Sequence, residues 1–370
     1  MRRIAAIVPY KIYPYHSGGQ KSIALFYQFF SQKREVFLIC TSDNTKPADS
    51  GYTLAPVLGS SVLRYINPFL YFKVKRFINE NKIDVIIIEQ PYFGWLGYLL
   101  KKSLKVKIII RSHNIEGLRF KSLQKWWWKI LWHYEKWAYS MADFTFFIQQ
   151  NDREYAAANY HVNPNKTTVI TSGITWNKPT NPEEKENAKR RLQELYNLSQ
   201  NETIIFFNGA YDYKPNRDAL EAIIYTINPQ LLLKADFAYK IIICGRNIPP
   251  EIVKQTFPNI ILAGFAKDID MYYKGSDIFI NPVNDGGGIK TKLVEALGFN
   301  LTSVSTINGA IGIDAAICNG KLLLSHGDND FATKIAEACS VHSSIGEEYY
   351  NYFYWGNIID KAVNNLEQIA

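Results

Sequence analysis

Cysteine is scarce in this sequence, and its cysteines lie far apart. The four are Cys40, Cys244, Cys318 and Cys339. A disulfide framework or a cysteine-based zinc site needs closer and more regular spacing. Cys40 and Cys244 also stand within apolar runs, which is typical of buried core positions. We therefore expect reduced thiols in a cytoplasmic protein.

Long apolar runs are missing as well. No apolar run reaches the roughly 20 residues that a transmembrane helix needs. The chain begins with Arg2 and Arg3, and the apolar stretch that follows, residues 4–8, is too short for a secretory signal peptide. No Gly-x-Gly-x-x-Gly motif follows this stretch, which disfavours a nicotinamide-dependent dehydrogenase.

Basic residues outnumber acidic ones only moderately. The chain has 42 Lys and Arg against 34 Asp and Glu, a formal net charge of +8 at pH 7. We expect this excess to be spread along the chain. It fits attraction to nucleotide phosphates or to an anionic membrane surface better than a nucleic-acid-binding face.

The length and the apolar pattern indicate two α/β domains. A chain of 370 residues with 47% hydrophobic content can build two cores. Short apolar runs alternate with amphipathic stretches, as in parallel sheets that are buried on both faces. The predicted strands are residues 4–8, 36–40, 85–88, 107–110, 144–148 and 168–171, then 203–207, 239–244, 260–262, 278–280, 301–304 and 321–324.

A polar stretch, residues 175–201, separates these two series of strands and contains a predicted charged helix at 183–196. We therefore predict two doubly wound Rossmann-like domains that face each other across a cleft. Their ligands should lie at the carboxyl ends of the strands.

The segment Asn281–Gly298 gives the strongest functional signal. An apolar strand leads into a loop and then into a helix, and the loop consists of Gly286, Gly287, Gly288 and Ile289. Glycine lets backbone N–H groups approach phosphate oxygens closely, and the start of the helix adds the positive end of its dipole. The segment therefore predicts an anion site, although such a turn can also be only a tight connection.

Three charged side chains follow this loop. Lys290 and Lys292 are predicted to bind phosphates, although one of them can face solvent because positions two apart on a helix point in different directions. Glu295 has the wrong sign for phosphate and suits sugar or ribose hydroxyl groups. Its apolar neighbours argue against a fully exposed carboxylate.

Other candidates stand where predicted strands end in the second half. Gly209 ends a strand, and Lys214 leads into the next helix, so the two can place a cation and a helix N-terminus at a diphosphate. Arg246 follows another strand and can bind phosphate or stack on a base. Either cation can also be an ordinary solvated side chain. Asp268 is read as a helix cap.

The first half carries a second group of candidates. Gly18 and Gly19 follow the first strand, where backbone N–H groups can face a phosphate or an acceptor. His113 ends a mid-domain strand beside Arg111 and Asn114, so its ring is expected to face the cleft, where an imidazole can donate or accept a hydrogen bond. Arg111 and Asn114 are predicted on the acceptor or sugar side. Glu116 is a weaker candidate and can simply cap the following helix.

Together these motifs resemble the retaining GT-B glycosyltransferases of the group 1, or family-four, type. Six segments occur in the order typical of that family: Ser17–Gln20, Arg111–Glu116, Asn208–Asn216, Ile243–Gly245, Gly264–Tyr273 and Asn281–Gly298. One position departs from the pattern. The family commonly has a glutamate eight positions before the residue equivalent to Glu295, and this chain has Gly287 there.

The resemblance implies an acceptor-binding domain at 1–175, a nucleotide-sugar donor domain at 176–350 and a closing helix at 351–370 that returns to the first domain. His113 and Glu295 would be the catalytic-site residues, acting in retaining transfer of a hexosyl unit to a hydroxyl acceptor on a glycan, a lipid-linked molecule or a protein. The setting implied is bacterial surface-glycan synthesis. No cofactor and no metal ligand are assigned. No Asp-x-Asp metal motif is recognised, so transfer is expected to proceed without a divalent ion. The alternative is a nucleotide-sugar epimerase of the same fold.

Residues 118–137 are unusually rich in tryptophan and lysine, and they include Trp126, Trp127 and Trp128. This combination suits the headgroup layer of a membrane. Three adjacent tryptophans cannot share one helical face, so packing inside the first domain is the alternative. Peripheral contact with the inner face of a membrane is therefore one expectation.

Overall fold

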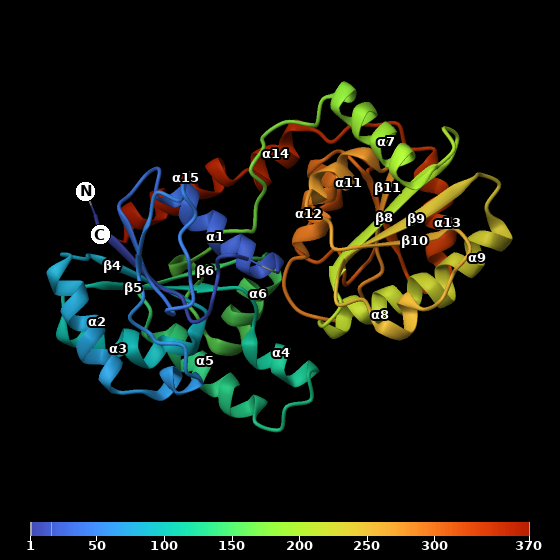
Figure 1. Ribbon diagram of the computed structural model, residues 1–370. Helices are drawn as coiled ribbons and strands as arrows, with labels where there is room; N and C mark the ends of the chain where they lie inside the picture. The colour runs from blue at the N-terminus through green and yellow to red at the C-terminus, as the bar shows by residue number, and fades with distance from the viewer. Residues whose placement is uncertain (1, 16, 370) are drawn as a thin grey trace. The chain divides into compact units, whose positions relative to one another are not determined.

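The computed structural model describes residues 2–15 and 17–369, and the chain forms two compact units (Figure 1). Unit 1 comprises the chain up to Gly173 together with the residues from Trp355 onward, and unit 2 is Ile174–Tyr354. The predicted domain boundaries at 175 and 350 lie close to these divisions. The assignment of acceptor and donor to the two domains stays a prediction.

Unit 1 is built on a seven-stranded parallel sheet with the order β3-β2-β1-β4-β5-β6-β7. The central strands are short runs of Ile, Val and Ala that are buried on both faces, as the sequence predicts. The edge strand β3 was not predicted because its three residues carry no apolar run. The strands are β1 (Ile4–Ile7), β2 (Val36–Ile39), β3 (Thr53–Ala55), β4 (Val85–Glu89), β5 (Lys107–Ser112), β6 (Phe144–Phe147) and β7 (Thr167–Val169).

Helices cover both faces of this sheet and leave an apolar core on each side. One face packs against α1 (Gly18–Phe30) and α15 (Trp355–Gln368). The other packs against α2 (Phe69–Glu80), α3 (Gly94–Ser103) and α5 (Trp128–Met141). The remaining helical segments of unit 1 are η1 (Val62–Ile66), η2 (Pro91–Phe93), α4 (Glu116–Ser122), α6 (Gln150–Tyr155), η3 (Ala156–Tyr160) and η4 (Pro164–Lys166).

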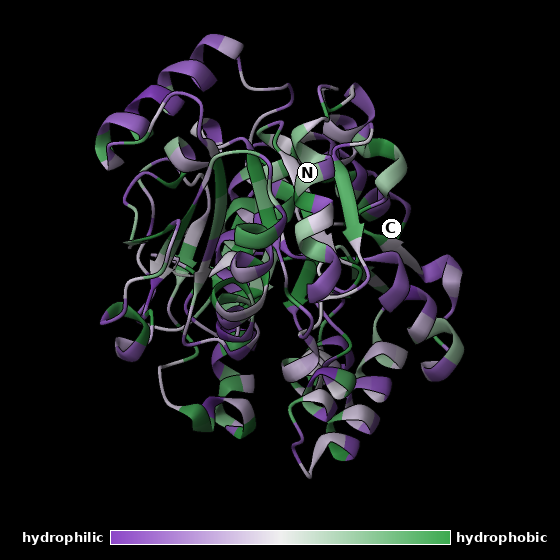
Figure 2. Cartoon of the chain, turned by 90° about the vertical axis from the view of Figure 1, so that its right-hand side faces the viewer, coloured by the Kyte–Doolittle hydropathy of each residue, from purple (hydrophilic) through white to green (hydrophobic). Residues whose placement is uncertain are grey.

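Unit 2 repeats the architecture with a six-stranded parallel sheet in the order β10-β9-β8-β11-β12-β13. In Figure 2 the strands are coloured mainly as hydrophobic, whereas the helices mix hydrophobic and hydrophilic residues. The strands are β8 (Thr203–Ala210), β9 (Tyr239–Arg246), β10 (Ile260–Gly264), β11 (Ile278–Asn281), β12 (Thr302–Thr306) and β13 (Leu322–Ser325).

The linker helix of unit 2 forms where the sequence predicts it. In α7 (Pro182–Tyr196), the side chain of Asn181 accepts a hydrogen bond from the backbone N–H of Glu183, and Pro182 occupies the first turn. The other helical segments are α8 (Lys214–Ala222), η5 (Ile223–Ile227), α9 (Asn228–Lys234), α10 (Pro250–Val253), α11 (Ile269–Gly275), α12 (Thr291–Gly298), η6 (Ala315–Cys318), α13 (Asp328–Cys339) and α14 (Glu347–Phe353).

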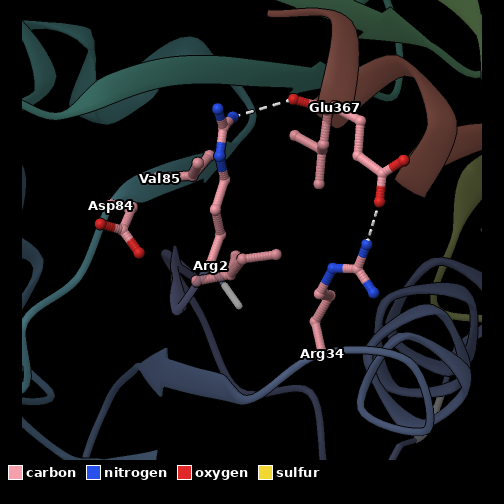
Figure 3. A pocket seen from close by; sticks show the side chains of 7 residues that line it. Arg2, Arg34, Asp84, Val85 and Glu367 are labelled. Atoms are coloured by element: carbon pink, nitrogen blue, oxygen red, sulfur yellow. Dashed lines mark hydrogen bonds and ion pairs between the residues drawn. The ribbon is translucent and has the colours of Figure 1, made fainter. Parts of the chain in front are cut away.

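Each unit has an open cavity at the amino ends of its strands. In unit 1 the cavity measures about 530 Å³ and lies beside β1 and β4 (Figure 3). Arg2 donates to the backbone carbonyl of Leu366 at 2.9 Å, and Arg34 pairs with Glu367, so this region ties α15 to the sheet. The unit 2 cavity, about 490 Å³, lies beside the first residues of β8 and β11. Both lie opposite the edge that carries the predicted site residues.

Candidate functional site

The candidate donor site lies at the carboxyl edge of the unit 2 sheet. The strand order reverses between β8 and β11, and α/β proteins commonly bind ligands where this happens. The segments that leave these strands carry most of the predicted donor residues. They come together at this edge because Lys292, on α12, donates to the carbonyl of Asn208 on β8 at 2.8 Å.

The glycine loop adopts a conformation that requires glycine. Gly286 and Gly288 have φ values of 89° and 72°, in the region that side chains disfavour. A Cβ atom at Gly286 would also lie 2.5 Å from the hydroxyl of Tyr213, the residue that caps α8. Gly287, which replaces the common glutamate, is exposed between them. The loop therefore packs against the start of α8.

Lys290 closes this loop. Its Nζ donates to the carbonyl oxygens of Gly286 at 2.8 Å and Gly288 at 3.0 Å. Lys290 is also the N-cap residue of α12. The two bonds turn loop carbonyls toward the ammonium group, and they place a positive charge at the start of a helix whose dipole has the same sign there.

Lys292 connects three elements of the site. Its Nζ donates to the carbonyl of Asn208 and to Oδ1 of Asn216, the latter at 2.7 Å, and it lies 4.5 Å from the ring centroid of Phe207. Burial, with a further contribution from Lys290, lowers the pKa of Lys292 to about 7. Its charge at neutral pH is therefore sensitive to an anion placed nearby.

Glu295 lies on the same helix and is half-buried, as its apolar neighbours predict. Tyr273 and Tyr349 are buried nearby, and burial first and the Glu295 carboxylate second raise the pKa of Tyr273 well above its usual value. Tyr273 donates to Asn208 Oδ1 at 3.2 Å. The site wall behind Glu295 is thus made of neutral tyrosines.

Gly209 and Gly245 are paired residues at the ends of β8 and β9. A Cβ atom at Gly245 would lie 1.8 Å from the carbonyl oxygen of Gly209, so this pair allows the two strands to meet closely. Arg246 follows, with its guanidinium carbon 6.0 Å from the ring centroid of Phe265. Lys214 begins α8 and is exposed in an ion pair with Asp218. Of these residues, Lys214 lies at the start of α8, against which the glycine loop packs.

In unit 1 the glycine turn forms the start of α1. Gly18 and Gly19 are its first two residues, and the side chain of Ser17 caps the helix by accepting from the backbone N–H of Gln20. A Cβ atom built at Gly19 meets no atom within 4 Å among the described residues, its chain neighbours and its own helix backbone aside. The predicted contact of this turn with an acceptor or phosphate stays a prediction.

His113 lies in a buried cluster around Glu89, which ends β4. The Glu89 carboxylate binds His113 Nε2, accepts from Arg111 Nη1 at 3.2 Å, and accepts from the hydroxyl of Tyr27. Burial alone would raise the pKa of Glu89, but Arg111 and His113 outweigh it and hold that pKa at about 2. Burial lowers the pKa of His113 despite the carboxylate. A neutral imidazole that donates from Nε2 leaves Nδ1 as an acceptor.

Arg111 differs from its expected placement. Its side chain is fully buried, its guanidinium carbon lies 4.0 Å from the ring centroid of Phe26, and it pairs with Glu89. The guanidinium therefore lies beside His113 and supports Glu89, which does not fit the predicted place of Arg111 on the acceptor or sugar side. The reason is that β5 is a central strand whose last residues are covered on both faces.

Asn114 and Glu116 belong to a second polar cluster. Glu116 is buried and accepts from Tyr92, from Arg119 at 2.9 Å and from Asn114 Nδ2 at 3.2 Å. The Glu116 side chain does not cap α4, although its position in the sequence made that role possible. Glu135 on α5 does so, because its two carboxylate oxygens accept from the backbone N–H groups of Glu116 and Gly117.

Glu89 and Glu135 were missed in the sequence. A carboxylate that ends a run of buried isoleucines is a signal that could have found Glu89, because a buried charge needs a partner. Glu135 gives no such signal within a helix of mixed composition. Burial raises its pKa to about 7, although Tyr139 and Tyr160 each donate to it at 2.9 Å.

The expectation that the chain has no Asp-x-Asp motif, a pattern that can bind metal ions, is wrong, because two such triplets occur at 268–270 and 328–330. In the first, Asp268 caps α11 by accepting from the backbone N–H of Met271, as predicted. In the second, Asp330 accepts from the backbone N–H of His326 and Asp328 from Asn284. Within residues 2–15 and 17–369, no group of three His, Cys, Asp or Glu side chains is arranged to hold a metal ion.

The chain matches two sequence families. Residues 17–176 match Glycosyltransferase Family 4, and residues 202–340 match Glycosyl transferases group 1. No curated protein sequence matches the chain closely enough to count as a relative.

Solved structures similar to this one span both units. Sucrose-phosphate synthase from Thermosynechococcus elongatus has a TM-score of 0.78 at 14% identity and covers 100% of this chain and 99% of its own. HepE from Anabaena, solved in complex with UDP and glucose, has a TM-score of 0.71 at 14% identity and covers 100% of both chains. The lipopolysaccharide outer core galactosyltransferase WaaB has a TM-score of 0.66 at 13% identity and also covers 100% of both.

Two parallel Rossmann-like units in this order define the GT-B fold. The two family matches, which together span most of both units, place the chain more narrowly. It belongs to the group 1 glycosyltransferases.

Proposed function

We propose that this protein is a retaining glycosyltransferase that moves a hexosyl unit from a nucleoside diphosphate sugar to a hydroxyl acceptor. One observation carries the proposal. The glycine loop at 286–288, the start of α8, Lys290 and Lys292 converge at the carboxyl edge of the second sheet. Backbone N–H groups, a helix N-terminus and two cations suit a diphosphate group.

In this proposal, departure of the nucleoside diphosphate dominates the reaction. Negative charge develops on the leaving diphosphate, and Lys290, Lys292 and the loop N–H groups stabilise it. Because the pKa of Lys292 lies at about 7, a nearby phosphate favours its charged form. Glu295 binds sugar or ribose hydroxyl groups, and His113 contacts the transferred sugar through the acceptor nitrogen Nδ1.

The donor is tested with a panel of nucleotides and nucleotide sugars in a thermal-shift assay. UDP-glucose and UDP come first because the similar HepE protein was solved with UDP and glucose. A ligand at a hundred times its dissociation constant adds about 2.7 kcal/mol to stability. Product formation that requires an acceptor distinguishes transfer from epimerisation. The anomeric configuration of the product, read by NMR, tests retention, and activity in a chelator tests the expected independence from metal ions.

Glu295 provides a sharper test of the site. The variant Glu295→Gln should keep its fold and lose about 10²-fold in transfer rate, which corresponds to about 2.7 kcal/mol at the transition state. Glu221→Gln, on the exposed side of α8, is the matched control and should transfer normally. Normal activity of a folded Glu295→Gln protein would remove this residue from the site.

The acceptor is proposed to be a hydroxyl group on a glycan or a lipid-linked molecule in surface-glycan synthesis, with a protein hydroxyl as the other possibility. The fold shared with the lipopolysaccharide galactosyltransferase WaaB supports this setting. Peripheral membrane contact is part of the proposal. Trp126 is 85% exposed, which suits it, whereas Trp127 packs against Phe120 at 4.6 Å between ring centroids.

A further inference from the structure

Large apolar side chains are exposed on a restricted part of unit 1. Among its described residues, twelve large apolar side chains are exposed, and eleven of these lie between positions 62 and 137. Five fall within eleven residues of η1 and α2. They are Val62 (74% exposed), Leu63 (64%), Ile66 (76%), Phe69 (69%) and Phe72 (66%).

These five side chains are exposed because other residues of η1 and α2 hold the segment in place. Tyr65 stacks on Phe93 with ring centroids 5.4 Å apart, and its carbonyl accepts from the indole N–H of Trp95 at 2.8 Å. In α2 the buried residues are Leu70, Val74 and Ile78. The segment is thus anchored on its inner side, and up to Phe72 its outer side carries apolar residues where an ordinary surface helix carries polar ones. Beyond Phe72 the exposed residues of α2 are polar or charged.

The positive charge is concentrated in the same part of the chain, and the expectation that it is spread evenly is wrong. Residues 61–142 contain 15 Lys and Arg and 5 Asp and Glu, which leaves 27 and 29 for the rest of the chain. Three of the five carboxylates, Glu89, Glu116 and Glu135, are buried. Glu80 and Asp84 are the two exposed ones, and Glu80 pairs with Arg76.

The apolar and basic residues belong to one layer of helices. The helices α2, α3 and α5 contact one another in that order on the same face of the sheet (Figure 1). Lys73 on α2, Lys102 on α3 and Lys129 on α5 supply charge along this layer. Trp126 and Ile130, both exposed, add apolar surface at the start of α5.

Apolar side chains surrounded by lysine fit an anionic lipid surface. Aliphatic and aromatic side chains enter the interfacial layer, and the cations meet the headgroups. A second copy of the chain is disfavoured because two surfaces of the same strong positive charge repel. No helix in the described part of the chain has both the length and the apolarity to cross a bilayer, so the contact considered is one that lies on the surface.

We propose that η1 and α2 form a membrane-docking surface, in which Val62, Leu63, Ile66, Phe69 and Phe72 enter the interfacial layer of an anionic bilayer. The proposal deepens the membrane contact proposed above and rests on it. The main site of membrane insertion is then η1 and α2, in place of the tryptophan-rich residues 118–137, and Trp126 lies at the edge of the surface. A lipid-linked acceptor would then be met by unit 1.

The test is sedimentation of the full chain with vesicles of phosphatidylcholine alone or mixed with phosphatidylglycerol. The native protein should bind only the mixed vesicles, and added salt should weaken binding. The triple variant Ile66→Ser, Phe69→Ser, Phe72→Ser should lose at least about tenfold in vesicle affinity. The matched control is Leu232→Ser, Leu233→Ser on α9 of unit 2, where the two leucines are 47% and 87% exposed, and it should bind as the native protein does.

Absence of vesicle binding by the native protein, or native-like binding by the folded triple variant, overturns the proposal. The proposal is also overturned if Trp126→Ala loses vesicle binding while the triple variant keeps it. In that case the membrane contact of the proposed function survives. If the triple variant does not fold, Lys73→Glu, Lys129→Glu decides, because unchanged binding contradicts a basic docking surface. The thermal shift with UDP is measured on every variant, so failure of the donor site is seen separately.

Discussion

Lys292 keeps its ammonium group away from water, and this gives the donor site a pH dependence. With a pKa of about 7 in the folded protein, it is largely neutral above pH 8. A bound diphosphate favours the charged form, so UDP should bind more weakly as pH rises from 7 to 9, by up to about tenfold per unit. Calorimetric titration at several pH values measures this. Lys292→Arg stays charged throughout and should give a flat profile; an equally flat native profile contradicts the assignment.

Glu89 and Arg111 form a buried ion pair whose loss should be costly. Glu89→Gln leaves the Arg111 guanidinium buried without its counter-charge, so the free energy of unfolding should fall by about 3–5 kcal/mol. Urea unfolding at neutral pH measures the change. Because the folded pKa of Glu89 is about 2, this stabilisation is present above pH 4.5 and is lost as pH falls toward 2.

A double variant controls for side-chain packing at this pair. Glu89→Gln with Arg111→Met removes both charges and should recover much of the lost stability, because no unpaired charge remains. If the double variant is as unstable as Glu89→Gln alone, the loss arises from packing or from His113, and the ion-pair explanation fails.

Strands and helices were predicted well where a continuous run of residues is buried. They were predicted poorly where the element depends on contacts with residues far away in the sequence. Buried runs such as residues 85–88 identified twelve of the strands, because a parallel sheet with both faces covered needs uninterrupted apolar residues. β3 is a short edge strand that depends on its pairing with β2, which the sequence does not display. The cap of α4 by Glu135 could not be predicted either, because Glu135 belongs to a different helix, α5.

The candidate site divides in the same way. The glycine loop, Lys290 and Lys292 could be proposed from the sequence because strand, glycine and helix occur in one continuous segment, and their role at a phosphate stays a prediction. The partners of these lysines come from β8 and α8, far along the chain, so their hydrogen bonds and the lowered pKa of Lys292 could not be predicted.

Glycine is required at some positions and can be replaced at others, depending on the space around its Cβ position. At Gly245, φ is 146° and a Cβ atom would overlap the Gly209 carbonyl, so Gly245→Ala should destabilise unit 2 by about 2–4 kcal/mol. Gly19 lies at the start of α1 with open space around its Cβ position, so Gly19→Ala should leave stability unchanged or raise it by up to about 1 kcal/mol. Thermal unfolding measures both. Similar stability in the two variants would show that β8 and β9 can separate at little cost.

The last helix of the chain, α15, completes the core of unit 1. The chain passes through unit 2 before α15 packs against α1, so residues at opposite ends of the sequence share one core. Arg2 and Arg34 bind Leu366 and Glu367 at the amino edge of the sheet, and Trp355 is fully buried against Phe26. The stability of unit 1 therefore depends on residues that follow unit 2.

In a calorimetric experiment, Trp355→Ala should lower the unfolding temperature of unit 1 and leave that of unit 2 unchanged. Loss of this fully buried ring should cost unit 1 about 3–5 kcal/mol, while unit 2 keeps its core. UDP binds unit 2 in our proposal, so the transition that UDP raises identifies unit 2, and the other transition should fall in the variant. Leu233→Ala, which removes an 87% exposed side chain from unit 2, serves as the control and should leave both transitions in place. An equal fall of both transitions in Trp355→Ala would show that α15 stabilises the chain as a single cooperative body, against its assignment to unit 1.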